Sequence, residues 1–360
     1  MSSFAFSSPD ILSLSPAVFD ARKAPFSLHG LYEPQQEGLF RRMPSEVAEA
    51  ANERVTLMHA NTAGARVRFS TDSAFVAVGA TYAPMGSPLA RGAGARSGPG
   101  AFCFDLYVDN KHVSVLSPEA LAEHEGVTIF DIKDGHYEVF QRFGTNKMRE
   151  ITIFFPSFVN VSELYIGLEE GRILMEGTPY KNEKPVVFYG SSITQGACAS
   201  RPGNTYPSIL SRRHGFDFIN LGFAGGALAE DPVIDYLCTL DTCLLVFDYD
   251  HNAYSPDFLR RTHQPALKKL RAAHPAIPFI LLSRPNLSGG EGQVKERIEI
   301  IKESYHALLS DGCGPVHFVN GLEIYRSLDG EMMTIDGTHP TDLGFYAMAS
   351  ALDEIFALYF

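Results

Sequence analysis

Residues 186–196 read VVFYGSSITQG, an apolar run of strand length that passes directly into a turn of small and polar residues. A run that is apolar throughout, with no alternation, is typical of a strand buried on both faces of a parallel sheet. The small residues Gly190, Ser191 and Ser192 would let the backbone turn sharply where that strand ends. Open α/β sheets bind ligands at this edge, so the segment predicts a fold class and a place for a site.

The chain after this strand repeats the same pattern through five units. The predicted strands are Val186–Tyr189, Phe216–Leu221, Cys243–Asp248, Pro278–Ser283 and Val316–Asn320, and the predicted helices are Tyr206–His214, Pro232–Leu237, Pro256–Ala273, Glu291–Leu309 and Thr341–Leu358. Alternation of strand and helix is typical of an α/β fold. We therefore expect an α/β/α domain with a five-stranded, mostly parallel sheet that helices cover on both faces.

The first half of the chain has a different sequence pattern, with short segments rich in Val, Phe, Tyr and Thr. The predicted strands are Val55–Ala60, Arg66–Thr71, Phe75–Tyr82, Ala101–Val108, His112–Leu116, His136–Phe143, Glu150–Phe155 and Ser162–Leu168. Many short strands separated by turn residues indicate an all-β sandwich or jelly roll. The polar stretch 177–184 reads as a linker, which predicts an accessory domain at 1–180 and an α/β domain at 181–360.

Composition excludes several classes of function. The net charge is −12, from 30 basic and 42 acidic residues, and no basic block is present, so we expect no nucleic-acid partner. No apolar run approaches the ~20 residues that span a bilayer, and we see no signal peptide, so we expect no membrane partner and a cytoplasmic location. Five cysteines without C-x-x-C spacing argue against disulfides and a zinc cluster. Oligomeric state is not predicted.

Three residue types that together activate a hydroxyl nucleophile occur in the predicted α/β domain. Ser192 follows the first strand, and Asp336 and His339 lie three residues apart before the last helix. An imidazole can take the hydroxyl proton, and a carboxylate fixes the tautomer of that imidazole and stabilises its cation. The alternatives are a helix N-cap at Ser192 and a helix-entry turn at Asp336, where Thr341 would be a competing cap.

Two further segments follow strands of the same sheet and carry groups that could donate to an oxyanion. Gly222 ends the second strand, and Asn252 lies on the loop after the third. A backbone N–H and a side-chain amide are suitable donors for the charge that develops in acyl transfer. Taken singly, each segment is explained as an ordinary loop; together with the serine, histidine and aspartate they form a complete set for acyl transfer.

The order Gly-Ser-Ser-Ile-Thr at 190–194, then Gly222, Asn252 and Asp336-x-x-His339, resembles the SGNH (GDSL-like) hydrolase superfamily. The G-x-S-x-G elbow of ordinary α/β-hydrolases is absent. The resemblance implies that Ser192 is the nucleophile, His339 the base and Asp336 its orienting group. It also implies an oxyanion hole made by the N–H groups of Ser192 and Gly222 and the side chain of Asn252, with no metal or organic cofactor.

Two positions depart from the superfamily pattern. Ser191 stands where the usual G-D-S has Asp, and the block that is commonly G-x-N-D reads Asp250-His251-Asn252-Ala253. Neither change removes a residue of the expected triad.

The first half also resembles a known segment, since 103–107 read CFDLY where a bacterial two-domain branch of the superfamily has G-x-D-L-Y. Related two-domain enzymes remove acetyl groups from plant-type polysaccharides or oligosaccharides. The resemblance therefore implies a carbohydrate acetylesterase acting on an acetylated sugar or oligosaccharide. We expect Asp105 and Tyr107 of the motif to be structural.

Four residues near the expected site are candidates for binding substrate. His251 would bind a sugar hydroxyl, or else be a surface histidine; Arg284 would reach the substrate, or else pair with Asp250; Arg201 would shape the leaving-group side, or else support the fold. Other functions remain open on the same residues. A lysophospholipase, thioesterase or acyltransferase would use the same triad, and a non-catalytic sugar-binding protein would use the same scaffold.

Overall fold

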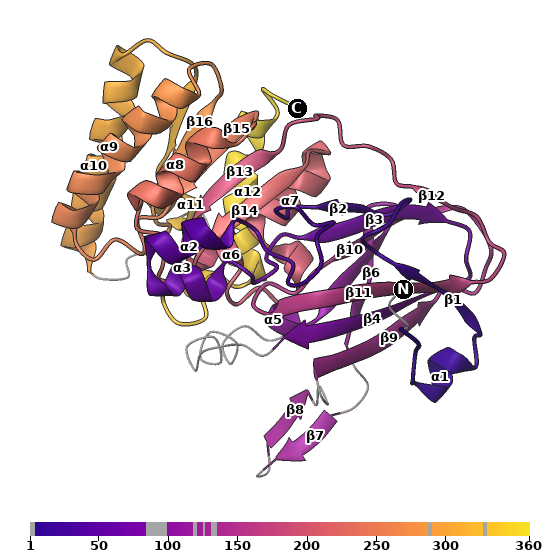
Figure 1. The fold of residues 1–360 in the computed structure, drawn as a ribbon. Helices are drawn as coiled ribbons and strands as arrows, with labels where there is room; N and C mark the ends of the chain where they lie inside the picture. Colours follow the sequence, from indigo (N-terminus) through magenta and orange to yellow (C-terminus); the bar gives the residue numbers. More distant parts are fainter. Residues whose placement is uncertain are drawn as a thin grey trace.

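The computed structural model describes residues 4–83, 99–117, 121–124, 127–130, 135–286, 290–326 and 330–360 of the chain. Strands dominate the first half, and alternating strands and helices make up the second (Figure 1). The predicted fold class, an α/β domain preceded by a β-rich region, is confirmed. In the part of the chain that the structure describes, no helix is both long and apolar enough to cross a membrane.

Antiparallel strands of the first half form two sheets. One has the order β1-β11-β4-β9 and the other β12-β3-β10-β5-β6, with β2 paired to β3; a separate hairpin joins β7 and β8. Side chains of both sheets meet in one apolar cluster that includes Val67, Val78 and Ile153, so the sheets pack face to face. The strands are β1 Pro16–Asp20, β2 Ser27–His29, β3 Arg66–Thr71, β4 Phe75–Ala83, β5 Phe104–Val108, β6 Lys111–Leu116, β7 Leu121–His124, β8 Val127–Phe130, β9 His136–Arg142, β10 Arg149–Phe154, β11 Asn160–Glu169 and β12 Leu174–Glu176.

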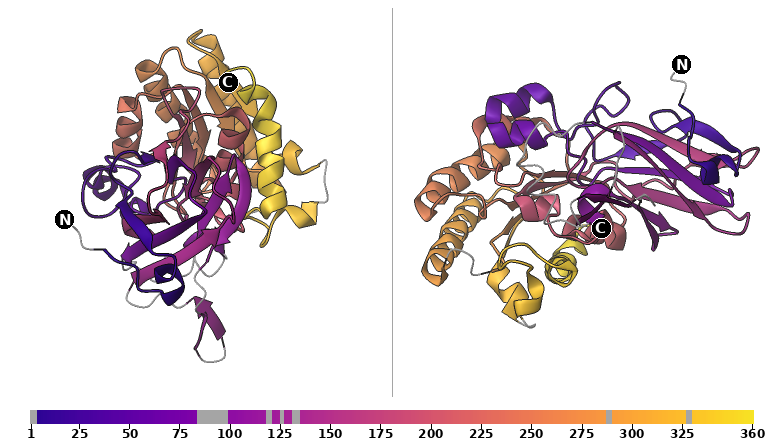
Figure 2. Two further views of the ribbon diagram at one scale, coloured as in Figure 1. Left: turned by 90° about the vertical axis from the view of Figure 1, so that its right-hand side faces the viewer. Right: turned by 90° about the horizontal axis from the view of Figure 1, so that it is seen from below.

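One predicted strand is wrong, because Val55–Ala60 lies largely in a helix. This helix, α3 (Glu53–Met58), begins at Asn52, whose side chain accepts the N–H of Val55. Together with α2 (Ser45–Ala51) it packs into the apolar core of the second half rather than onto the β-sheets (Figure 1). Seen from below, α2 and α3 lie at the end of the molecule that holds the helices (Figure 2). The described residues of the first half also include two one-turn helices, α1 (Pro9–Leu12) and α5 (Pro99–Phe102).

The second half is built on a five-stranded sheet, ordered β14-β13-β15-β16-β17, in which all neighbouring strands are parallel. Successive side chains of β13 enter different cores: Val187 and Tyr189 one, Val186 and Phe188 the other. Both faces of the sheet are therefore covered, as the unbroken apolar runs predict. The strands are β13 Val186–Gly190, β14 Phe218–Gly222, β15 Leu244–Asp248, β16 Phe279–Leu282 and β17 Val316–Val319.

Helices on the two faces divide the core. Side chains of α8, α9 and α10 enter the cluster with Val187, and those of α7, α11 and α12 enter the cluster with Phe188. The helices are α6 Ser192–Gln195, α7 Tyr206–His214, α8 Asp231–Thr239, α9 Pro256–Ala273, α10 Glu291–Ser310, α11 Gly321–Arg326 and α12 Asp342–Phe356, with 3-10 turns at Pro202–Asn204 and Gly330–Met333. The boundary at 180/181 stays a prediction.

Candidate active site

Ser192 lies at the carboxyl edge of the sheet, as the first residue of α6. The hydroxyl of Ser191 caps this short helix by accepting the N–H of Ile193 at 3.2 Å. A helix's first N–H groups have no carbonyl one turn earlier, so the N–H of Ser192 is placed to bind a ligand. A Cβ on Gly190 would collide with the side chain of Thr194 and the carbonyl oxygen of Asp248, which explains the glycine before the turn.

The three residues expected to form a triad are in contact. Ser192 Oγ lies 3.0 Å from His339 Nε2, and Asp336 Oδ2 lies 2.9 Å from His339 Nδ1. Asp336 Oδ1 also accepts the N–H groups of Thr338 and His339 at 3.1 and 2.8 Å. Burial alone would raise the pKa of Asp336, but the N–H and imidazole of His339 outweigh it and lower that pKa to about 2. The carboxylate is therefore charged at neutral pH and can stabilise the imidazolium that forms when His339 accepts a proton.

The loop that carries His339 is fixed from both sides. Ile335 donates its N–H to the carbonyl of His339 at 2.9 Å, and Asn286 Nδ2 donates to the carbonyl of Thr338 at 2.9 Å. The cap of α12 comes from Thr341, whose hydroxyl accepts the N–H of Gly344. Asp336 is thus not the cap of α12, and its carboxylate is left to His339.

The predicted role of Gly222, on the loop after β14, requires a correction. Gly222 donates its N–H to Asn220 Oδ1 at 2.9 Å and is buried, so this N–H is not available to an oxyanion. The glycine that meets Asn252 is Gly225, whose N–H lies 3.2 Å from Asn252 Oδ1. Asn252 Nδ2 donates to the carbonyl of Phe223 at 2.9 Å. Because an amide nitrogen carries two hydrogens, one remains for a ligand.

A buried arginine from the first half holds this loop from behind. Arg42 Nη1 donates to the carbonyls of Asn220 and Gly222 at 2.8 and 2.7 Å, and its other nitrogens donate to the carbonyls of Met58 and Asn61. No local pattern in the sequence pointed to Arg42, since its partners on this loop, Asn220 and Gly222, lie 178 and 180 residues away. The first half therefore contributes to the shape of the candidate site.

Two more arginines hold the segment that contains His251 and Asn252. Arg284 and Asp250 form a buried ion pair, with Nε and Oδ1 3.5 Å apart. Arg297, which sequence reasoning missed, donates to the carbonyl of Asp250 at 2.8 Å and to that of Ala253 at 2.9 Å. These two carbonyls bracket His251 and Asn252, so Arg297 fixes the backbone of both. Because Arg284 and Asp250 are both buried, we assign them to the support of this segment and not to substrate binding.

His251 lies beside the candidate base. Among the residues that the structure describes, no hydrogen bond involves its ring, and its Nε2 is buried. Burial lowers the pKa of His251 well below its ordinary value, and the charges of Arg284, His339 and Arg297 lower it further. The ring therefore favours its neutral form and is a weaker proton acceptor than an ordinary imidazole.

Arg201 points to the first half of the chain. Its Nη1 lies 3.3 Å from Asp105 Oδ2 and also donates to the hydroxyl of Tyr107, while the N–H of Gly203 donates to Asp105 Oδ2 at 2.9 Å. Asp105 and Tyr107, which we expected to be structural, thus anchor the loop that follows Ser192.

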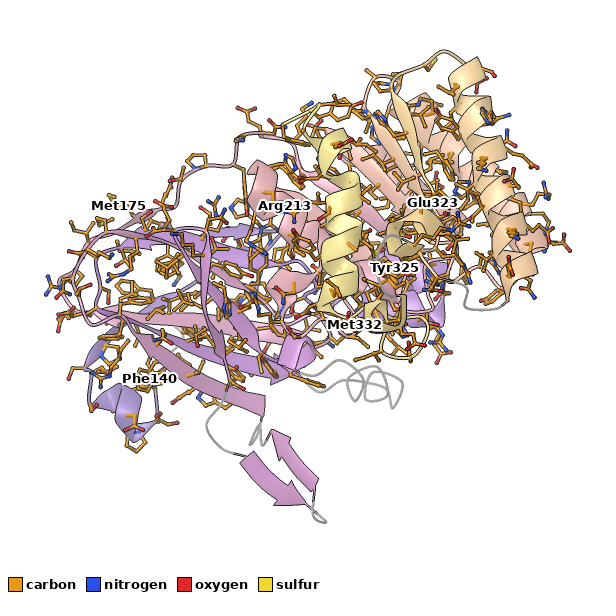
Figure 3. The ribbon with its side chains drawn as sticks, turned by 180° about the vertical axis from the view of Figure 1, so that it is seen from behind. Phe140, Met175, Arg213, Glu323, Tyr325 and Met332 are labelled. Carbon is orange, nitrogen blue, oxygen red and sulfur yellow. The ribbon has the colours of Figure 1, made fainter. Side chains whose placement is uncertain are left out.

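A cavity of about 460 Å³ adjoins the loop of His339 on the side of β16. Asn286, Tyr325 and Gly337 are among its lining residues. Seen from behind, Tyr325 lies beside the lower end of α12, near Met332 (Figure 3). Among the described residues, Ser192, Asn252 and His339 do not line this cavity, so it neighbours the triad without containing it.

Family models match both halves of the chain. A family model described as GDSL-like lipase/acylhydrolase matches residues 183–357, and one described as the N-terminus of an SGNH-hydrolase-type esterase (GxDLY) matches residues 17–174. No curated protein matches the chain. A solved structure of a putative GDSL-like lipase from Bacteroides ovatus is 26% identical, with a TM-score of 0.77, and the match covers 95% of this chain and 98% of that one.

Two further solved structures show the same fold at lower identity. The salicylyl-acyltransferase SsfX3 from a tetracycline biosynthetic pathway is 18% identical, with a TM-score of 0.74 and coverage of 96% of this chain and 97% of that one. A family two carbohydrate esterase from Cellvibrio japonicus is 13% identical, with a TM-score of 0.60 and coverage of 95% and 97%.

Proposed function

Because the chain belongs to the GDSL-like lipase/acylhydrolase family and has the GxDLY-type N-terminus of SGNH esterases, we propose that it is a serine esterase that removes O-acetyl groups from carbohydrates. The observation that carries this proposal is the contact of Ser192 Oγ with His339 Nε2 at 3.0 Å, with Asp336 on the other imidazole nitrogen. A non-catalytic sugar-binding protein would not need this contact.

In the proposed reaction, Ser192 Oγ attacks the ester carbonyl and its proton passes to His339 Nε2. The negative charge that forms on the carbonyl oxygen is stabilised by the N–H of Ser192 and the free hydrogen of Asn252 Nδ2. The N–H of Gly225 donates to Asn252 Oδ1 and so holds this amide in place. The C–O bond to the sugar then breaks, and the sugar oxygen takes the proton from His339. An acetyl group remains on Ser192.

Water completes the cycle. His339 takes a proton from a water molecule, whose oxygen attacks the acetyl carbonyl, and the C–O bond to Ser192 breaks. The proton returns to Ser192, and acetate leaves. Throughout, Asp336 stabilises the imidazolium, as its low pKa allows. The name of one protein with this fold, a carbohydrate esterase, supports the choice of a sugar ester.

Labelling by a fluorophosphonate probe, followed by acetate release from a panel of acetylated oligosaccharides, tests the proposal. We expect the wild-type protein to be labelled and active, and Ser192→Ala to be unlabelled and at least about 10³-fold slower. Ser310→Ala, which changes an exposed serine at the end of α10, is the matched control and should keep both properties. Labelling of Ser192→Ala would refute the nucleophile, and acyl transfer to a non-water acceptor without acetate release would favour an acyltransferase.

A further inference from the structure

Arg54, in the first half of the chain, lies against the turn that meets Asn252. The helix α3 is tied to this turn by Asn52, whose Nδ2 donates to the carbonyl of Gly226 at 2.9 Å. A Cβ on Gly225 would lie 3.0 Å from Arg54 Nη1 and 3.3 Å from its Cζ. A Cβ on Gly226 would lie 3.0 Å from Arg54 Cβ. The two glycines therefore leave room for the arginine to lie on the turn.

The charge of Arg54 is available to a ligand. Its side chain is exposed, and within the described ranges it makes neither a hydrogen bond nor an ion pair. The other arginines near the turn differ, since Arg42 and Arg297 are buried and donate to carbonyl oxygens. Only a surface cation can meet a substrate directly, and Arg54 is such a cation.

Arginines and acidic groups both lie around this turn, in a chain whose net charge is −12, and Glu230 accepts a hydrogen bond from Asn52 Nδ2. Arg284 is paired with Asp250, but Arg297 bonds carbonyls. Burial, followed by the charge of Asp250, raises the pKa of Asp248 well above its ordinary value, which favours its uncharged form. Burial also raises the pKa of Glu230, which favours its uncharged form, so the exposed cation beside the turn, Arg54, is not fully offset by this neighbour.

We propose that Arg54 binds a carboxylate of the substrate, so that the site prefers acetyl esters of acidic sugars to those of neutral sugars. This rests on the proposed function. A guanidinium can hold a carboxylate through two parallel hydrogen bonds, a geometry that an ammonium cannot reproduce. The N–H of Gly225, against which Arg54 lies, is 3.2 Å from Asn252 Oδ1. The carboxylate and the ester therefore belong to the same sugar unit or to adjacent units.

The test compares an acetylated glucuronic acid with the corresponding acetylated glucuronamide, which has nearly the same shape and no charge. The measured quantity is the ratio of kcat/KM for the acid to kcat/KM for the amide. We expect a ratio of about 10 for the wild-type protein at low salt, falling toward 1 in Arg54→Gln, with most of the change in KM. Arg54→Lys should give an intermediate ratio, and added salt should lower the wild-type ratio.

Arg261→Gln is the matched control, because it removes one exposed positive charge from α9 and should keep the wild-type ratio. A wild-type ratio of 1 or less, an undiminished ratio in Arg54→Gln, or an equal fall in Arg261→Gln would each overturn the role of Arg54. If the wild-type protein releases acetate from neither compound, the proposed function fails. Calorimetric binding of glucuronic acid then decides the role of Arg54, which is refuted if Arg54→Gln binds as the wild type does or if neither binds.

Discussion

The N–H of Gly203 donates to Asp105 Oδ2 at 2.9 Å, and this bond joins the two halves of the chain close to Ser192. Asp105 is fully buried, and Arg201 and His112 approach its two oxygens. A buried carboxylate is stable only when its partners compensate for lost water. The contact thus links the N-terminal motif to the loop that shapes one side of the candidate site.

Asp105→Ala should destabilise the protein by about 2–4 kcal/mol, because it leaves the buried N–H of Gly203 without its acceptor and removes the carboxylate that faces the guanidinium of Arg201. Asp105→Asn keeps an acceptor and should cost less. The measurement is the shift of the denaturant unfolding midpoint. Asp235→Ala, which removes an exposed ion pair with Lys269, is the control and should cost under about 1 kcal/mol. Equal shifts for Asp105→Ala and Asp235→Ala would contradict the anchoring role.

Asp336→Asn should lower kcat by about 10²- to 10⁴-fold, since a neutral amide cannot stabilise the imidazolium of His339. Because the pKa of Asp336 is about 2, its ionisation should produce no step in a kcat/KM profile between pH 5 and 9. A variant with nearly wild-type kcat would remove Asp336 from the mechanism.

The same substitution predicts a change in stability at acid pH. The pKa of Asp336 is lower in the folded protein than its ordinary value of 3.8, so its stabilising effect is present above that value and is lost as the pH falls toward 2. The difference in unfolding midpoint between the wild type and Asp336→Asn should therefore shrink from pH 5 to pH 2.5. A difference that grew on acidification would show that the carboxylate is not held by His339.

Asn252→Ala should lower kcat by about 10²- to 10³-fold with little change in KM, because the charge that its amide stabilises exists only in the transition state. Asn252→Asp separates the donor role of this side chain from its acceptor role. It keeps an oxygen to accept the N–H of Gly225 but loses the donor, so it should lose as much activity as the alanine variant. A rise in KM alone would make Asn252 a substrate-binding residue instead.

Elements whose stability comes from their own pattern were predicted well. The helices Tyr206–His214 and Pro256–Ala273 have the predicted bounds, because each begins after a capping residue, Thr205 or Ser255, with proline in its first turn. The strands of the second half were found because parallel strands are apolar on both faces, although the edge strand β17 is only partly buried. The contact of Ser192 with His339 agrees with the geometry that the spacing of the motifs implied.

Long-range contacts explain the predictions that were wrong and the residues that the sequence did not reveal. Val55–Ala60 has strand-like residues, but Asn52 caps a helix there, and Val55 and Met58 pack in a core formed by residues after 186. The sequence between 220 and 226 offers several glycines, and only the structure shows that the N–H of Gly222 bonds Asn220 Oδ1 and that of Gly225 bonds Asn252 Oδ1. Arg54 and Arg297 reach the site from distant elements, so no local spacing could predict them.

Asp248 offers a test of the electrostatics beneath the site. It is buried at the end of β15, where Oδ2 accepts the hydroxyls of Thr194 and Tyr206 at 3.0 and 3.1 Å. Burial, and then the charge of Asp250, raise its pKa well above the ordinary value. Since the folded pKa lies above the unfolded one, the stability that this carboxyl contributes is lost as the pH rises through the folded pKa.

Asp248→Asn keeps an acceptor and never ionises, so its unfolding midpoint should equal or exceed that of the wild type, with a gain that grows from pH 5 to pH 9. Asp248→Ala leaves two buried hydroxyls without an acceptor and should cost about 2–4 kcal/mol at every pH. An Asn variant as unstable as the Ala variant at pH 9 would show that the buried carboxyl is charged, with a partner that the amide cannot replace.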